Sequence, residues 1–144
     1  MTFAAGALIF FRIVGALWVI GGIFLARQLL ALGKIERALD QIGGDPDQKD
    51  DRGRDRWMLA GGALTALAGA AMLVGSWLSI PALCCVIAHQ MLYFVRQRRR
   101  ELAAGSDADA ADEARPARST INAFFFSLVM AVLAAWLGRS HMLW

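Results

Sequence analysis

The stretch WMLAGGALTALAGAAMLVGSWL, residues 57–78, and the run IPALCCVIAHQMLYFV, residues 80–95, set the architecture of this 144-residue chain. Neither run contains an acidic or basic residue other than one His, and about 20 apolar residues cross the roughly 30 Å hydrocarbon core of a bilayer. One helix over both runs would be about 58 Å long, which is too long for one crossing. We therefore expect two membrane-spanning helices joined by a tight turn, with Pro81 in the first turn of the second helix.

Two further apolar runs, residues 3–32 and 121–138, lie on either side of this pair. The first is longer than one crossing needs, so we expect it to tilt or to leave the membrane as helix. Overall, 58% of the residues are hydrophobic, against about 45–50% in soluble domains. We therefore predict an all-α polytopic membrane protein, in which residues 1–144 form one domain of four transmembrane helices packed as a bundle.

Basic residues are concentrated between the runs. Of 15 Lys and Arg residues, 13 lie in segments 27–56 and 96–118, and the turn between the second and third runs has none. By the positive-inside rule, the loops at about 33–56 and 96–119 are cytoplasmic, which predicts an N-out/C-out topology. The excess of Arg over Lys, with abundant Ala and Gly, indicates a GC-rich bacterial genome. We therefore expect a protein of the bacterial inner membrane, and the predicted topology places its termini in the periplasm. Because the basic residues flank apolar runs, we expect no nucleic-acid binding.

The first cytoplasmic loop is predicted to begin as a helical extension of the first span. Its apolar residues are spaced three and four apart, which is typical of an amphipathic helix at a membrane surface or against a partner. These residues are Leu32, Ile35, Leu39 and Ile42, and residues 43–46 are expected to end the helix. The second loop begins with a basic cluster that is expected to contact anionic lipid headgroups. The cluster is Arg96, Arg98, Arg99 and Arg100, and an acidic linker at 107–113, expected to be disordered, follows it.

Small residues recur every four positions in two of the spans, which lets helix backbones approach closely in lipid. Packing within one bundle and packing against a partner subunit or a second copy of the chain are both open. The predicted packing positions are Gly61, Thr65, Gly69, Gly62, Ala66 and Ala70 in the second span, and Ser127, Ala131 and Ala135 in the fourth.

Arg12 lies inside an apolar run, and because lipid penalises ionisable groups it is a candidate functional residue. In one interpretation its side chain extends to the phosphates of the outer lipid layer. In the other it faces the bundle and binds backbone carbonyls, an anionic group or a quinone headgroup. No Asp or Glu lies in any of the four runs, so no acidic partner is evident.

His89 is the second such residue, near the middle of the third run. It shares a helix face with Tyr93, four residues later, and Gln90 is adjacent. The alternatives are a hydrogen-bonded packing residue, a quinone contact and a haem ligand, and haem is disfavoured because no other run has a His. Arg12, His89 and Tyr93 are therefore the candidate quinone contacts, and we expect no metal site.

The sequence shows no catalytic signature. A P-loop, a HExxH zinc motif, a GxSxG nucleophile turn and a dinucleotide-binding glycine motif are all missing. Without a carboxylate in the runs, an autonomous proton-coupled carrier is disfavoured. We assign no catalytic residue and expect that the protein is not an enzyme.

The stretch FRIVGALWVIGG, residues 11–22, resembles the start of DoxX-like four-helix membrane proteins, which open with an Arg, a few apolar residues and a Gly. GGALTALAGAAMLVG, residues 61–75, resembles their glycine-rich second helix, and the hairpin after it falls where theirs does. Thr65 stands where the family often has a Glu, and both loops are long for the family. The resemblance implies association with quinol oxidases, or with oxidoreductase complexes that handle thiol or oxidative stress, and a role for Arg12.

Three functions are open from the sequence. The first is a non-catalytic accessory or assembly subunit of a bacterial inner-membrane complex, respiratory or redox in character, because a small bundle with small-residue faces suits partner subunits. The second is a small quinone-binding membrane redox protein that uses Arg12, His89 and Tyr93. The third is a small four-helix subunit of a transporter, which requires a large membrane partner.

Overall fold

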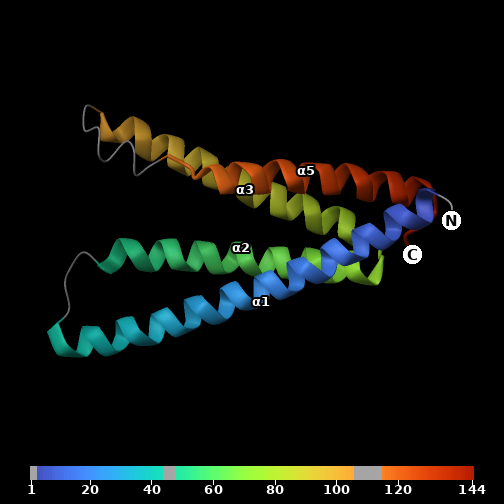
Figure 1. Ribbon diagram of the computed structural model, residues 1–144. Coiled ribbons are helices and arrows are strands. Elements are labelled where there is room, and N and C mark those ends of the chain that lie inside the picture. Colours follow the sequence, from blue (N-terminus) through green and yellow to red (C-terminus); the bar gives the residue numbers. More distant parts are fainter. Residues whose placement is uncertain (1–2, 44–47, 106–114) are drawn as a thin grey trace.

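The computed structural model describes residues 3–43, 48–105 and 115–144, except for the side chains of residues 29, 32, 34–43, 48–56 and 104. All regular structure in these residues is helical. The helices are α1 (Phe3–Gly43), α2 (Gln48–Val74), α3 (Ser79–Ala104) and α5 (Arg118–Arg139) (Figure 1).

Each of these helices contains a stretch that is long and apolar enough to cross a membrane. The stretches are Phe3–Gln28, Trp57–Val74, Ser79–Ala103 and Arg118–Arg139. A helix satisfies its backbone hydrogen bonds internally, which is the condition that lipid imposes on a spanning segment. Within the described residues, the prediction of four helices with the length and composition of membrane spans is confirmed, as expected of a multi-pass membrane protein.

Two of the helices continue well beyond their apolar runs. The backbone of α1 is helical through Gly43, where the sequence predicts an extension of the first span. The side chains of the predicted amphipathic stripe (Leu32, Ile35, Leu39 and Ile42) lie outside the described part of the chain. In α3, residues 96–104 are helical, although the sequence assigned them to a loop. Arg, Gln, Glu, Leu and Ala are all strong helix formers, so no residue interrupts the helix before Gly105, whose φ is +58°.

The start of α2 also lies inside a segment that was assigned to a loop. Its backbone is helical from Gln48, before the apolar stretch begins at Trp57. The predicted turn near Pro46 and the predicted acidic linker at 107–113 fall outside the described residues. The charged residues therefore indicate where the apolar runs end, but they do not indicate where the helices end.

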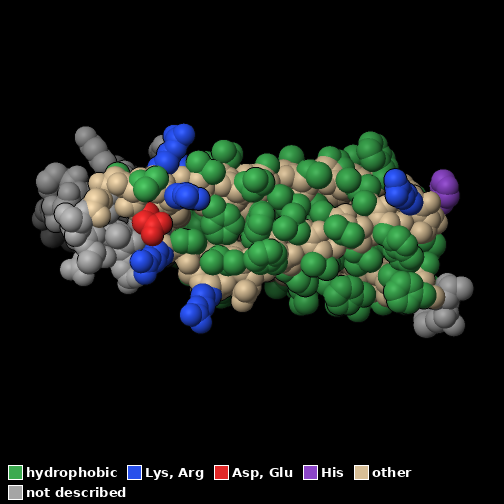
Figure 2. Space-filling view, turned by 90° about the horizontal axis from the view of Figure 1, so that it is seen from above, with side chains coloured by type: hydrophobic (Ala, Val, Ile, Leu, Met, Phe, Trp, Pro, Cys, Tyr) green, Lys and Arg blue, Asp and Glu red, His purple; other side chains and the backbone are tan. Residues whose placement is uncertain are grey.

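The described helices contact one another in chain order. α1 packs on α2, α2 on α3 and α3 on α5, and a smaller contact between α1 and α5 closes the ring. The start of α1 and the end of α5 lie at one end of the molecule, and the end of α1, the start of α2 and the end of α3 lie at the other (Figure 1). Apolar side chains cover the middle of the face in Figure 2, and most of its basic side chains gather towards the end at which α3 ends. Which end is cytoplasmic stays a prediction.

The turn between α2 and α3 requires a glycine. Gly75 follows the last residue of α2 with a φ of +76°, in the left-handed region that favours glycine. The turn is also paired with residues that follow α5. The Trp144 amide donates to the Gly75 carbonyl at 3.2 Å, and the Trp77 amide donates to the Trp144 carbonyl at 3.0 Å. Helix α3 then begins at Ser79, one residue before the predicted start at Ile80, and Pro81 lies in its first turn as predicted.

The buried apolar core lies in the half of the molecule nearest this turn. Its members come from all four helices, so the core joins the ring together. They are Phe11, Val14, Met72, Leu83, Met130, Ala134 and Leu137. Met142 and Leu143, which follow α5, pack against the same cluster. The other half of the molecule contains the candidate site.

α1 and α2 are joined by glycines rather than by large side chains. A Cβ on Gly15 would lie 2.6 Å from the Gly69 carbonyl oxygen, and a Cβ on Gly69 would lie 2.7 Å from the Gly15 oxygen. One heptad away along both helices, a Cβ on Gly22 would lie 2.8 Å from the Gly62 oxygen. The two backbones therefore approach closely over two helical turns, and a Cβ at Gly15, Gly22 or Gly69 would meet a backbone atom of the other helix within 3 Å.

Candidate ligand site

His89 of α3 is held against α2 by two contacts. Its ring stacks on the Trp57 ring, with the centroids 4.3 Å apart and the planes inclined by 19°. Its edge lies over Gly61, where an added Cβ would be 2.9 Å from His89 Cε1. The imidazole therefore occupies the space that any larger residue at position 61 would take.

Trp57 also contacts a cation. The guanidinium carbon of Arg96 lies 5.0 Å from the centroid of the Trp57 ring, within the range of a cation–π interaction. Because Trp57 is on α2 and both Arg96 and His89 are on α3, this aromatic ring links the two helices at the polar end of the candidate spans.

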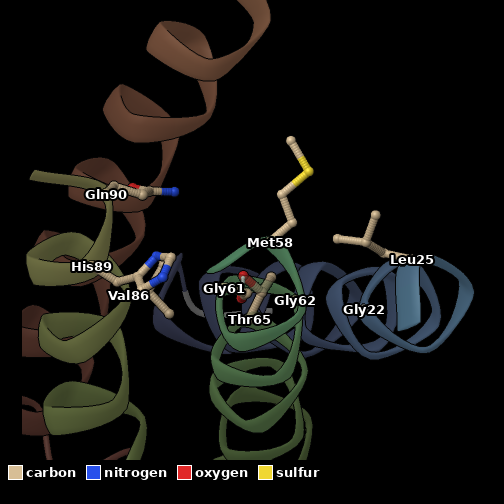
Figure 3. A pocket seen from close by; sticks show the side chains of 10 residues that line it. Gly22, Leu25, Met58, Gly61, Gly62, Thr65, Val86, His89 and Gln90 are labelled. Atoms are coloured by element: carbon tan, nitrogen blue, oxygen red, sulfur yellow. Dashed lines mark hydrogen bonds between the residues drawn. The ribbon is translucent and has the colours of Figure 1, made fainter. Parts of the chain in front are cut away.

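A pocket of about 260 Å³ lies beside His89, between α1, α2 and α3. Helix α3 contributes polar groups to its wall, and α1 and α2 contribute mainly glycines and apolar side chains (Figure 3). The lining residues are Gly21, Gly22 and Leu25 of α1, Met58, Gly61, Gly62 and Thr65 of α2, and Val86, His89 and Gln90 of α3. The glycines create the space, because each removes a side chain from the wall.

Three polar atoms at or beside this pocket are buried and have no hydrogen-bond partner within the described part of the chain. They are His89 Nε2, Gln90 Oε1 and Trp57 Nε1. The Thr65 hydroxyl, in contrast, donates to the Gly61 carbonyl of its own helix at 2.8 Å. Buried polar groups are nearly always paired, so such a concentration indicates a site for a polar ligand. Among the described residues, no group of three or more His, Cys, Asp or Glu is placed to bind a metal.

Arg12 lies far from this pocket. Its side chain is exposed, and Nη2 lies 3.5 Å from the Val74 carbonyl oxygen at the end of α2. The Trp144 indole donates to the same carbonyl at 3.2 Å. Val74 follows Gly61 by 13 residues, which is roughly 20 Å along the helix axis. Arg12 therefore lies next to a backbone carbonyl and does not share a site with His89, and which of its two interpretations holds stays open.

Tyr93 is on α3, one turn after His89, and its hydroxyl accepts a hydrogen bond from Gln97 Nε2 at 3.2 Å. It is not among the described residues that line the pocket. The three candidate quinone contacts therefore occupy three different environments. The binding of a quinone by any of them stays a prediction.

The predicted small-residue positions of α2 divide between two neighbours. Gly62, Ala66 and Gly69 contact α1. Gly61 and Thr65 line the pocket next to α3, and Ala70 is exposed. Spacing by four residues thus identified residues that approach other helices, but not which neighbour each of them meets.

In α5, Ser127 is buried, and its hydroxyl donates to the Ala123 carbonyl of its own helix at 2.9 Å. Ala131 packs against the core and Ala135 is exposed. All four arginines of the basic cluster are exposed, as anionic lipid would require: Arg96, Arg98, Arg99 and Arg100. Their binding to lipid stays a prediction.

Sequence reasoning missed Trp57 and Gly61 as the partners of His89. It predicted Gly61 only as a helix-packing position. Gln90 was noticed only as a neighbour of His89. No signal in the sequence could have joined Trp57 to His89, because they belong to different helices and their contact depends on how α2 and α3 are rotated about their axes.

Comparison of the chain with models of protein families, with curated proteins and with solved structures produced no match. The resemblance to DoxX-like proteins therefore stays a prediction. The function has to be argued from the geometry of the chain itself.

Proposed function

We propose that this chain is a non-catalytic accessory or assembly subunit of a larger membrane complex, in the inner membrane of a bacterium and with both termini periplasmic. The supporting observation is how little of its spans the chain buries by itself. In an 18-residue apolar stretch of each candidate span, between 17% and 22% of the residues are buried within the structure. Most of the other residues retain surface that lipid or the helices of other subunits can cover.

The use of small residues supports the same proposal. In lipid, helices associate through close packing rather than through apolar burial, so small residues make the strongest contacts. Within the described residues, the glycine-to-glycine approach is confined to α1 and α2. Helices α3 and α5 face outward with exposed apolar side chains, among them Met91, Val129 and Val132. A partner that packs on these helices would supply the burial that the chain lacks.

The test is affinity purification of the tagged protein from its native membrane in a mild detergent, followed by mass spectrometry of the copurifying proteins. We expect membrane subunits in a fixed ratio to the tagged chain. An unrelated four-span protein, tagged and expressed at the same level, controls for non-specific association. A monomeric protein, with every membrane complex intact after deletion of its gene, would contradict the proposal.

The identity of the partner sharpens the proposal further. Oxidase or dehydrogenase subunits would place the chain in a respiratory or redox complex. A large transporter would instead identify it as a small transporter subunit.

A further inference from the structure

Two neighbouring side chains of α3 have unpaired polar atoms at the pocket between α1, α2 and α3. His89 and Gln90 both line it, and His89 Nε2 and Gln90 Oε1 are buried without a partner among the described residues. Both side chains project from α3 towards α2 (Figure 3). A third unpaired atom, Trp57 Nε1, belongs to the ring stacked on His89. Such groups are rarely left unpaired, which points to a polar partner that the chain does not supply.

The position and size of the pocket restrict what this partner can be. Its lining residues all lie within the candidate membrane spans of α1, α2 and α3. Its volume of about 260 Å³ is just below the roughly 300–1,000 Å³ of sites that enclose a drug-sized ligand. A headgroup fits, and the rest of the molecule would lie in the surrounding lipid.

The charge of the wall restricts the partner again. Apart from His89, none of the described lining residues is ionisable. The Arg96 side chain, which contacts the other ring of the stacked pair, is exposed. An ionised headgroup in the pocket would be desolvated without a counter-charge, which is strongly unfavourable. An uncharged hydroxyl can instead pair with an imidazole nitrogen, as donor or as acceptor, and can donate to an amide oxygen.

From these observations we infer that the pocket binds the uncharged hydroxyl-bearing headgroup of a membrane-soluble amphiphile. His89 and Gln90 bind its oxygens, and the glycines of α1 and α2 make room for it. Two kinds of molecule carry such a hydroxyl: a quinol ring, the reduced form of a quinone, and a diacylglycerol with its free hydroxyl. This site is independent of the proposed accessory role, since it requires no partner subunit.

The first experiment is lipid extraction from the purified protein, with separate quantification of quinones, diacylglycerols and phospholipids per mole of protein. The protein is then stripped of lipid and incubated with decylubiquinol or with dioctanoylglycerol, and the bound probe is measured after gel filtration. We expect one neutral amphiphile at close to one mole per mole of protein. The two probes identify which of the two sources it comes from.

Blocking the pocket is the decisive variant. Gly21 lines it, and a Cβ added at Gly21 meets nothing within 4 Å, so Gly21→Leu adds volume at the pocket wall without a clash of its Cβ. We expect it to reduce bound probe by at least about ten-fold, because it takes the volume that the headgroup needs. The matched control is Gly6→Leu, also in α1 and also with nothing within 4 Å of an added Cβ, but outside the pocket lining. Gly6→Leu should bind as the unmodified protein does.

The polar contacts are tested one at a time. His89→Phe retains a flat ring to stack on Trp57 and removes the ring nitrogens. Gln90→Leu removes the amide, and Gln97→Leu is its control, because Gln97 is on the same helix and its amide pairs with Tyr93. Loss of one hydrogen bond should weaken binding about three- to ten-fold in His89→Phe and in Gln90→Leu, and not in Gln97→Leu.

Three outcomes would overturn the inference. One is equal binding by Gly21→Leu and Gly6→Leu when both proteins elute as the unmodified protein does. Another is a phospholipid as the stoichiometric lipid that Gly21→Leu loses, since its headgroup is charged. The last is unmodified protein that contains no neutral amphiphile and binds neither probe.

Discussion

The α1–α2 contact and the α3–α5 contact differ in how the two helices of each pair pack together. Between α1 and α2, the backbones approach closely where glycines meet, with Gly15 against Gly69 and Gly22 against Gly62. Between α3 and α5, side chains fill the space. The rings of Phe94 and Phe124 meet edge to face, with the centroids 5.4 Å apart.

The difference has a physical basis. Lipid is as apolar as a leucine side chain, so helix association depends on packing and not on escape from water. Where two backbones touch, no space is left for an additional side-chain atom. Where side chains touch, they can adjust by changing rotamers. The α1–α2 contact should therefore be intolerant of added volume, and the α3–α5 side of the molecule should be sensitive mainly to lost volume.

The largest effect is expected for Gly69→Val. Its Cβ would lie 2.7 Å from the Gly15 oxygen and 2.9 Å from the Val19 nitrogen, and backbone atoms cannot move aside as side chains can. We expect a loss of about 3 kcal/mol in the free energy of unfolding, at the upper end for overpacked sites. The measurement is an SDS titration of the detergent-purified protein. Gly6→Val, in open space, is the control, and equal stability of the two variants would show that the glycine contact does not hold α1 to α2.

An intermediate effect is expected for Met130→Ala in α5. Met130 is fully buried in the core, so the change leaves a cavity, and we expect a loss of about 2 kcal/mol. Its neighbour Val129 is 61% exposed, and Val129→Ala should change stability by less than about 0.5 kcal/mol. The same titration compares the two. If they lose equal stability, the core is not where the structure places it.

The smallest effect is expected for Ser127→Ala. Ser127 is buried, but its hydroxyl donates to a carbonyl of its own helix, so removing it breaks no contact between helices. A loss of no more than about 0.6 kcal/mol should follow. The midpoint of thermal unfolding, read by gel filtration of heated samples, should barely change. A loss as large as that of Gly69→Val would mean that Ser127 binds another helix or another subunit.

Much of the fold was open to prediction from the sequence because it depends on local properties. Runs of apolar residues identify membrane helices, and Pro81 with the uncharged turn before it separates the second span from the third. The helical extension of α1 to Gly43 was also visible as a periodic pattern. The helical continuation of α3 to Ala104 differs from the loop that the charged residues 96–100 predict, because arginine-rich segments also form helices readily.

The candidate site was only half visible in the sequence. His89 attracted attention as an ionisable residue in an apolar run, and that reasoning holds for any lone polar group in lipid. Its grouping with Arg12 and Tyr93 could not be checked without the fold. The sequence does not give the depth of each residue along the bundle, nor the rotation of each helix about its axis. The structure groups His89 with Trp57, Gly61 and Gln90 instead, and places Arg12 at the α2–α3 turn.

The sequence by itself determined that this protein is built from four membrane-length helices, and where the chain turns between the second and the third. These properties follow from hydrophobicity, chain length and local backbone chemistry, each of which is a property of a single segment. Only the tertiary structure decided which glycines face α1, which face α3, and that a pocket opens between them beside His89. Those outcomes depend on the rotation and offset of one helix against another, and many small contacts distributed over several helices set them together.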